Sequence, residues 1–227
     1  MYPGIHARER PDKTAYVMAK SGLAVSYAEL DQASNRVARL LRRLGLKRGQ
    51  SIAVLIENNP RFFEVCWAAQ RAGLYYTPIS THLKAGEAAY IIGDCDAGAL
   101  FTSRAVAGAT SGLVEMAPGL RAAFMCDGTL QGYESLEEAT AAESDSPIED
   151  ESEGSEMLYS SGTTGRPKGI RNPLPERPIG TPSPMMAALA SGMFGAGPDT
   201  VYLSPAPLYH SAPLRFTMTM LRIGATV

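Results

Sequence analysis

The chain has 227 residues, of which 45% are hydrophobic and 19% are charged, and 23 acidic against 21 basic residues leave a formal net charge of -2. This composition is typical of a soluble globular protein that buries a substantial core without disulfides or structural metals. The near-neutral balance excludes the charge pattern that calls for nucleic acid or an anionic membrane surface as a partner. No apolar run has the length that a bilayer-spanning helix needs.

The three cysteines, Cys66, Cys95 and Cys126, are widely separated and show no paired spacing. This arrangement argues against a disulfide framework or a zinc site and favours a reducing, cytoplasmic environment. The first ten residues contain no apolar signal-peptide core, so we expect no secretion signal.

The amino-terminal part of the chain predicts a β-hairpin followed by a long amphipathic helix. Residues 14–18 and 24–26 are strand-like, with a turn between them. Ser26 and Glu29 have the spacing of a capping box, which opens the helix. Apolar residues then recur with a period of about 3.6, while basic residues predict a solvated face. The apolar set is Leu30, Ala33, Val37, Leu40, Leu41 and Leu44, and the basic set is Arg36, Arg39, Arg42 and Arg43.

Between residues 51 and 160, short apolar segments alternate with helical patterns. We predict strands at 51–56, 75–78, 99–102, 122–125 and 156–160, and helices at 61–72 and 84–92, with a weak one at 106–116. Strands that alternate with helices form βαβ units, so the predicted fold class is α/β, with mainly parallel sheets flanked by helices. Trp67, Tyr75 and Tyr159 are predicted core residues, whereas His6 and His82 are predicted on the surface.

Four further segments have less regular patterns. Residues 143–154 are acidic and predict a surface connection, which is also where we would divide the chain into subdomains. The proline-rich segment 172–184 predicts an extended or turning loop. Residues 185–197 predict a buried helix and its exit, whose methionines fill gaps in a core or line a pocket, and residues 221–227 predict the start of a strand.

The sequence SSGTTGRPKG at residues 160–169 follows a predicted strand and has the composition of a polyphosphate-binding loop. Its glycines lack a Cβ atom, which allows positive φ angles and a close approach of the backbone to a ligand. Consecutive N–H groups in such a turn form a nest that attracts anions. The candidate binding residues are Ser160, Ser161, Gly162, Thr163, Thr164, Gly165, Lys168 and Gly169. A polar surface loop is the plain alternative, but the density of hydroxyls, the glycine spacing and the terminal lysine favour phosphate binding.

Three other motifs do not fit the loop. A Walker A motif needs four residues between its glycines and a hydroxyl residue after the lysine, whereas Gly162 and Gly165 are too close and Gly169 follows Lys168. A G-x-S-x-G nucleophile elbow is absent, and no G-x-G-x-x-G follows an early strand. The spacing therefore disfavours a kinase or GTPase.

The decapeptide resembles the phosphate-binding signature of the adenylate-forming superfamily, which includes acyl-CoA synthetases, peptide-synthetase adenylation domains and luciferase. A second block, YLSPAPLYH at residues 202–210, is similar to the strand and loop that end beside the acyl site of that family. The resemblance covers essentially the whole chain and is greatest to bacterial fatty-acid or medium-chain acyl-CoA ligases. One departure is the segment from Arg171 onward, where many relatives continue into a helix.

The resemblance implies a two-step reaction. A carboxylic acid attacks ATP to give acyl-AMP and pyrophosphate, and the thiol of CoA then displaces AMP. The hydroxyls of the loop and Lys168 would bind the β- and γ-phosphates, with Mg²⁺ as the metal and Thr164 near its coordination shell. His210 would be the catalytic residue, near the carboxylate and the entry of the pantetheine arm; a histidine satisfied by local hydrogen bonds is the alternative. The resemblance leaves open a homodimer and peripheral membrane contact.

The resemblance also implies that residues 1–227 are a partial N-terminal AMP-binding domain without the C-terminal domain. We therefore expect the isolated chain to bind ATP weakly and not to turn over. Two alternatives stay open, a non-catalytic nucleotide-binding remnant and an adenylating enzyme that loads a carrier protein. The acid is expected to be a fatty or medium-chain acid on overall likeness alone.

Overall fold

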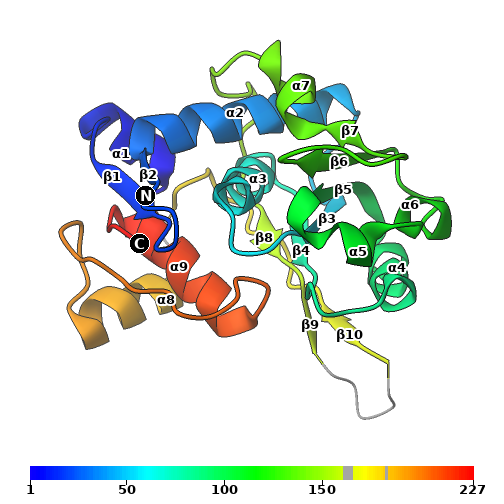
Figure 1. Cartoon of the computed structure of the whole chain (residues 1–227). Coiled ribbons are helices and arrows are strands. Elements are labelled where there is room, and N and C mark those ends of the chain that lie inside the picture. The colour runs from blue at the N-terminus through cyan, green and yellow to red at the C-terminus, as the bar shows by residue number, and fades with distance from the viewer. Residues whose placement is uncertain (161–165, 182–183) are drawn as a thin grey trace.

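The computed structural model describes residues 1–160, 166–181 and 184–227. Its centre is a six-stranded sheet in the order β7-β6-β5-β3-β4-β8, in which every neighbouring pair is parallel (Figure 1). The strands are β3 (Ser51–Leu55), β4 (Tyr75–Pro78), β5 (Ala97–Ser103), β6 (Ala122–Cys126), β7 (Glu134–Ser135) and β8 (Ser155–Glu156). The parallel order confirms the predicted α/β class.

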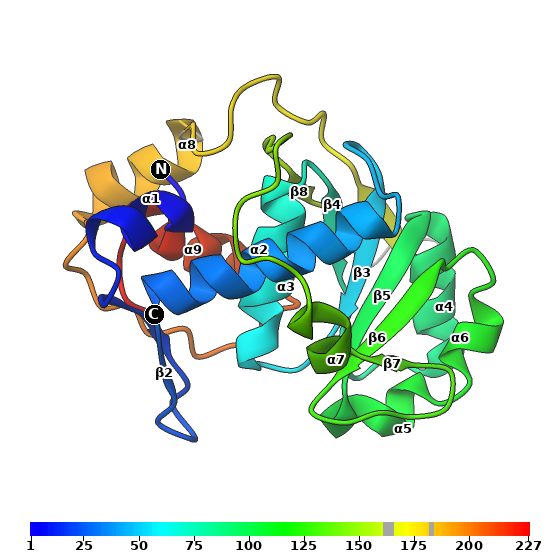
Figure 2. The ribbon, with the colours of Figure 1, turned by 90° about the horizontal axis from the view of Figure 1, so that it is seen from above.

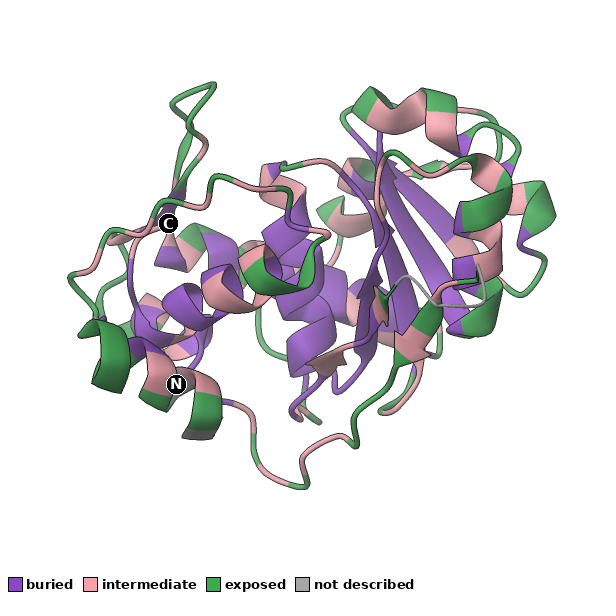
Figure 3. Cartoon of the chain, turned by 90° about the horizontal axis from the view of Figure 1, so that it is seen from below, coloured by how far each residue is buried: buried purple, intermediate pink, exposed green. Residues whose placement is uncertain are grey.

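Helices cover both faces of this sheet. Helices α2 (Tyr27–Arg43) and α3 (Pro60–Arg71) lie on one face, and α4 (Ala85–Asp94), α5 (Ala107–Thr110) and α6 (Leu113–Met116) lie on the other (Figure 2). Successive residues of β3 point to opposite faces, so Ile52 and Val54 join the core under α2 and α3 while Ala53 and Leu55 join the core under α4. Both central strands are buried along their whole length (Figure 3).

Local signals place the two helices of the first face as predicted. The Ser26 side chain accepts a hydrogen bond from the Glu29 N–H at 3.2 Å, and Glu29 Oε2 accepts from the Ser26 N–H at 2.7 Å, which completes the capping box. Asn59 caps α3, and Gly73, with a φ of 64°, follows its last turn. Trp67 and Tyr75 are buried, as predicted.

The predicted helix at 106–116 is wrong as one element. The chain instead forms a 3₁₀ turn (Arg104–Val106) and the short helices α5 and α6. Gly112 separates the two helices with a φ of 71°, a left-handed conformation that no α-helix continues through. Helix α7 (Leu136–Ala141), which has a serine cap, was not predicted from the sequence.

A second, small set of extended segments joins the two ends of the described chain. The predicted hairpin is present as β1 (Thr14–Val17) and β2 (Ala24–Ser26). Val227 exchanges backbone hydrogen bonds with Ala15 and Val17 at 2.9 and 2.8 Å. The prediction that residues 221–227 begin a strand is wrong at its start, because 221–223 complete helix α9 (Ser211–Ile223) and Gly224 ends it with a φ of 87°.

The segment after residue 184 is less buried than its apolar composition predicts. Helix α8 (Pro184–Ala188) runs into a π-helical turn (Leu189–Met193). The side chains of Met185 and Met193 are 73% and 71% exposed, so the prediction of a buried methionine group is wrong for both. Among the residues of this segment whose burial is described, Ala190 and Ala196 are buried, against the end of α9, and Phe194 contacts the Phe216 ring at 6.3 Å between centroids.

The burial of the histidines agrees with the sequence prediction for one residue and not for the other. His82 is exposed as predicted, but His6 is buried and its Nε2 lies 2.9 Å from the Arg222 carbonyl. The error arises because helix α1 (Pro3–Glu9), absent from our prediction, packs this histidine near the end of α9. All three cysteines are free and buried, and burial raises their pKa values, to about 11 for Cys95.

The acidic segment 143–154 crosses α2 and pairs with its basic face. Arg39 donates to the carbonyls of Ser146 and Pro147, both at 2.8 Å, and Arg43 pairs with Glu143 at 2.7 Å. The sequence predicted that the basic residues of α2 form a free solvated face. In the structure they instead bind segment 143–154. A subdomain boundary here stays a prediction.

Glu153, just before β8, joins three parts of the fold. Its side chain is buried, with the residue 4% exposed. It accepts hydrogen bonds from Gln70 Nε2 of α3 at 2.5 Å and from the Gly180 N–H at 3.0 Å, and it pairs with Arg222 of α9. One carboxylate next to the sheet edge therefore connects α3, the proline-rich loop and α9.

Among the described helices, none has the length and hydropathy to cross a bilayer.

We expect Glu153→Ala to lower the free energy of unfolding by about 2–4 kcal/mol, because it leaves Gln70 Nε2 and the Gly180 N–H without their acceptor and the Arg222 guanidinium, whose side chain is 13% exposed, without its partner. Asp145→Ala is the control, since it removes an exposed carboxylate that pairs with Arg36 at 3.4 Å, and its effect should stay within about 1 kcal/mol. Chemical denaturation followed by circular dichroism measures both. Equal losses in the two variants would contradict a connecting role for Glu153.

Candidate functional site: the β9–β10 hairpin and the start of α9

The predicted phosphate-binding loop lies on a two-stranded hairpin that extends from the edge of the sheet (Figure 1). Strands β9 (Leu158–Ser160) and β10 (Lys168–Ile170) are antiparallel, and Ser160 lies directly opposite Lys168. Both of these residues are exposed. The other candidates on the loop, Ser161, Gly162, Thr163, Thr164 and Gly165, lie outside the described residues.

Gly169 lies under the side chains of Met157 and Tyr159. A Cβ atom at this position would lie 2.5 Å from Met157 Cε and 2.8 Å from Tyr159 Cζ. A larger residue here would therefore displace these two side chains, which gives the glycine a packing role. This function differs from the close approach to a ligand that the sequence predicts for it, which stays a prediction.

Helix α4 holds the hairpin through two tyrosines. The Tyr159 hydroxyl donates to Asp94 Oδ2 at 2.5 Å, and the Tyr90 hydroxyl donates to the Pro167 carbonyl at 3.3 Å. Burial, with Asp94 beside the hydroxyl, raises the pKa of Tyr159 far above its ordinary value, so the phenol stays protonated and keeps donating. Tyr159 is half-buried at the edge of the core under α4. Asp94 and Tyr90 were missed, because no spacing signal connects them to residues about 70 positions away.

Two cations follow the undescribed part of the loop. The Arg166 guanidinium lies 5.7 Å from the Tyr90 ring centroid, and Lys168 is exposed on β10. Neither forms an ion pair with a carboxylate in the part of the chain that the structure describes. Their charges are available to an anion, so the described residues fit a polyphosphate at this position.

His210 is the residue immediately before α9 and is exposed. Its ring lies 4.6 Å from that of Tyr209, which in turn lies 6.2 Å from that of His82. Asn58, in the loop between β3 and α3, fixes the loop before His210: its Oδ1 accepts from the Leu208 N–H at 2.9 Å. No sequence signal connects His82 or Asn58 to residues 202–210, since their relation to that segment is purely tertiary.

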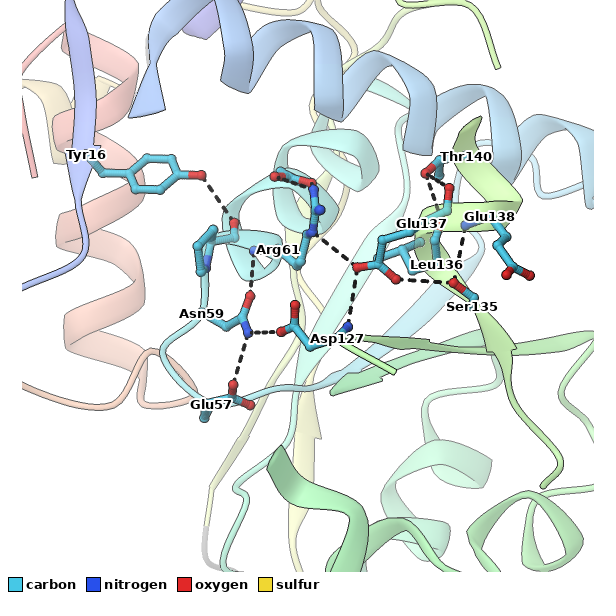
Figure 4. A network of polar contacts seen from close by, with 12 residues as sticks. Tyr16, Glu57, Asn59, Arg61, Asp127, Ser135, Leu136, Glu137, Glu138 and Thr140 are labelled. Carbon is cyan, nitrogen blue, oxygen red and sulfur yellow. Dashed lines mark hydrogen bonds and ion pairs between the residues drawn. The ribbon is translucent and has the colours of Figure 1, made fainter. Parts of the chain in front are cut away.

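The carboxyl ends of β3, β5 and β6 form a second polar centre (Figure 4). Asn59 Nδ2 donates to Glu57 Oε1 at 3.0 Å and to Asp127 Oδ2 at 2.8 Å, and Ser103 donates to Glu57. Parallel sheets often bind ligands where the strand order reverses, between β3 and β5 in this sheet. These polar groups are instead bonded to one another, which favours the β9–β10 hairpin as the site.

Within the described ranges no group of three or more histidine, cysteine, aspartate or glutamate side chains could hold a metal ion. The predicted Mg²⁺ contact, Thr164, falls outside those ranges. The metal assignment therefore stays a prediction.

Comparison with known proteins adds to this geometry. The family described as AMP-binding enzyme matches residues 5–227. The long-chain-fatty-acid–CoA ligase FadD13 of Mycobacterium tuberculosis is 29% identical over 228 residues, covering 96% of this chain and 42% of the relative. The crotonobetaine/carnitine–CoA ligase of Escherichia fergusonii is 30% identical over 228 residues, covering 94% of this chain and 43% of the relative.

A solved structure of ATP-bound MatB from Rhodopseudomonas palustris matches with a TM-score of 0.76 and 26% identity, covering all of this chain and 44% of that one. The chain thus spans less than half the length of these relatives.

We expect Tyr159→Phe to loosen the hairpin, because the Asp94 carboxylate loses its donor from β9. Hydrogen exchange at the amides of 158–160 and 168–170 should become about 10-fold faster. Tyr133→Phe is the matched control: it removes one tyrosine hydroxyl that donates to the Thr110 carbonyl at 2.8 Å, away from the hairpin. Unchanged exchange in Tyr159→Phe would show that strand pairing alone holds the hairpin.

Proposed function

Because the chain belongs to the family of AMP-binding enzymes, we propose that the protein containing it activates a carboxylic acid with ATP and transfers the acyl group to CoA. The observation that carries this proposal is the exposed pair Ser160 and Lys168 at the end of a hairpin anchored on α4. The relatives named above are ligases that form CoA thioesters, and one matched structure contains ATP.

In this proposal the loop at 160–169 holds the β- and γ-phosphates of ATP. Lys168 and Arg166 supply positive charge, and the hydroxyls of Ser160, Ser161, Thr163 and Thr164 donate hydrogen bonds. Gly162 and Gly165 allow the backbone to approach the phosphates. A Mg²⁺ ion bound to the phosphates would neutralise further charge, with Thr164 as the proposed residue nearest to its coordination shell.

His210 is proposed to face the carboxylate of the acid. It lies at the amino-terminal end of α9, a helix of 13 residues with no acidic residue in its first turn. Free N–H groups and the helix dipole favour an anion at such an end. An exposed imidazole beside this anion can donate a hydrogen bond to it and contact the incoming thiol.

The acceptor is proposed to be CoA, because the named curated relatives are CoA ligases. A carrier-protein phosphopantetheine offers the same thiol, so comparing the two acceptors with the complete enzyme separates these possibilities. A non-catalytic remnant would form no acyl-AMP with any acid.

We expect Lys168→Gln in the complete enzyme to weaken ATP binding by about 10- to 100-fold, since one charge-assisted contact to phosphate is lost. Calorimetric titration with ATP and acid-dependent ATP–pyrophosphate exchange measure the effect. Lys47→Gln is the control, because Lys47 is exposed and lies between α2 and β3. Unchanged ATP affinity and exchange in Lys168→Gln would refute the phosphate assignment.

His210→Ala should act on the acid and thiol rather than on the nucleotide. We expect ATP affinity to stay within about 2-fold of the wild type, while the KM for the acid rises about 10-fold because one hydrogen bond to the carboxylate is lost. Steady-state thioester formation and ATP titration together test this. A variant that loses ATP affinity but keeps its KM for the acid would place His210 elsewhere in the mechanism.

A further inference from the structure

A cleft of about 350 Å³ lies between α3, the β4–β8 edge of the sheet, the loop after β10 and α9. Its apolar wall includes Trp67, Tyr76 and Met218, together with two methionines of α8. The residues of α9 that line it, from Arg215 to Arg222, follow one another along the helix that begins just after His210. The cleft therefore lies farther along α9 than the proposed position of the carboxylate.

Two buried donors in this cleft have no acceptor among the residues that the structure describes. Trp67 is fully buried, yet its Nε1–H finds no hydrogen-bond partner among the described residues. Arg177 Nε is also buried and has no partner in the same ranges. Both residues line the cleft. Buried donors in folded proteins are almost always satisfied, so two of them in one cleft indicate an acceptor that a ligand would supply.

The charges of the cleft indicate the sign of that acceptor. Arg215 pairs with Glu156 at 2.7 Å, and Arg222 pairs with Glu153 while its guanidinium lies 5.4 Å from the Trp67 ring. Arg177 has no carboxylate partner in the described part of the chain. Three guanidinium groups thus face two carboxylates, which leaves a net positive charge beside the two unpaired donors. An anionic acceptor satisfies both features.

The distance along α9 from His210 to Arg222 indicates how long an acid must be to reach the Trp67 end of the cleft. From His210 to Arg222 the helix rises about 18 Å, at about 1.5 Å per residue. A short acid held at His210 would not reach the Trp67 end of the cleft. A long aliphatic chain would reach it, lying against the methionines and Tyr76, and would bring its far end to Trp67 and Arg177.

We propose that this cleft binds the far end of the acid substrate, and that this end carries a second carboxylate, which accepts hydrogen bonds from Trp67 Nε1–H and Arg177. The substrate is then a long-chain α,ω-dicarboxylic acid rather than an unsubstituted fatty acid. This inference rests on the proposed function, since it assigns the substrate class of the same acid-activating site.

Trp67 itself reports binding, because it is the single tryptophan of the chain. Titration with dodecanedioate should change its emission, with half-saturation at about one tenth of the concentration that dodecanoate needs. Arg177→Gln should remove this 10-fold preference, and Arg177→Lys should retain part of it. Arg104→Gln, which changes an exposed arginine outside the cleft, is the matched control and should keep the full preference.

Equal affinity for the two acids, or an unchanged preference in Arg177→Gln, would overturn the proposal. An equal emission change with inorganic phosphate would also count against it, because the cleft would then be a general anion site. Circular dichroism of each variant identifies losses of the preference that come from unfolding. If Arg177→Gln is unfolded, the partial preference expected of Arg177→Lys tests the proposal in its place.

Acid-dependent ATP–pyrophosphate exchange by the complete enzyme separates this inference from the proposed function. If dodecanedioate binds with the expected preference but no acid supports exchange, the proposed function fails and the cleft assignment stands as a binding site only. If dodecanoate supports exchange as well as dodecanedioate does, the enzyme is an acid ligase and the dicarboxylate inference is wrong.

Discussion

The buried carboxylate of Glu153 is the constraint on which the arrangement of the cleft depends. Removing a charge from water is expensive, and this one is compensated by donors from three separate segments: α3, the loop after β10 and α9. The loop after β10 contains several prolines and has few regular hydrogen bonds of its own. Glu153 fixes the end of this loop at Gly180. The Tyr75 hydroxyl donates to the Asn172 carbonyl at 2.5 Å and Arg48 donates to the Pro175 carbonyl at 2.8 Å, so Arg177 lies between held points.

The strands β3, β4, β5 and β6 were predictable because their information is local, whereas β7 was missed and the predicted strand at 156–160 divides between β8 and β9. Continuous apolar runs identified β3 and β5, and the Ser26–Glu29 spacing identified the start of α2, since each pattern follows from the geometry of one element. What the sequence did not predict depends on contacts between distant residues. His6 is buried where α1 packs near the end of α9, and Met185 of α8 is exposed in the described structure, and neither outcome has a signal near the residue in the sequence.

The candidate site also contains residues that the sequence indicates and residues that it does not. The sequence alone indicates residues 160–169, since glycines, hydroxyls and a lysine have direct chemical reasons to occur together in a phosphate-binding loop, and phosphate binding there stays a prediction. The groups that position the site could not be predicted: Asp94 and Tyr90 lie on α4, and Asn58 holds the loop before His210 from the loop between β3 and α3. Side chains that act through tertiary hydrogen bonds leave no periodic or compositional signal near the motif they support.

The burial of all three thiols has a practical consequence. Thiolates, not thiols, react with alkylating reagents, and buried cysteines with raised pKa values present few of them at neutral pH. A cysteine introduced on the exposed face of the β9–β10 hairpin would therefore react selectively without first replacing the native ones. A fluorophore or spin label attached there could follow movements of the hairpin while the native sequence of the core stays intact.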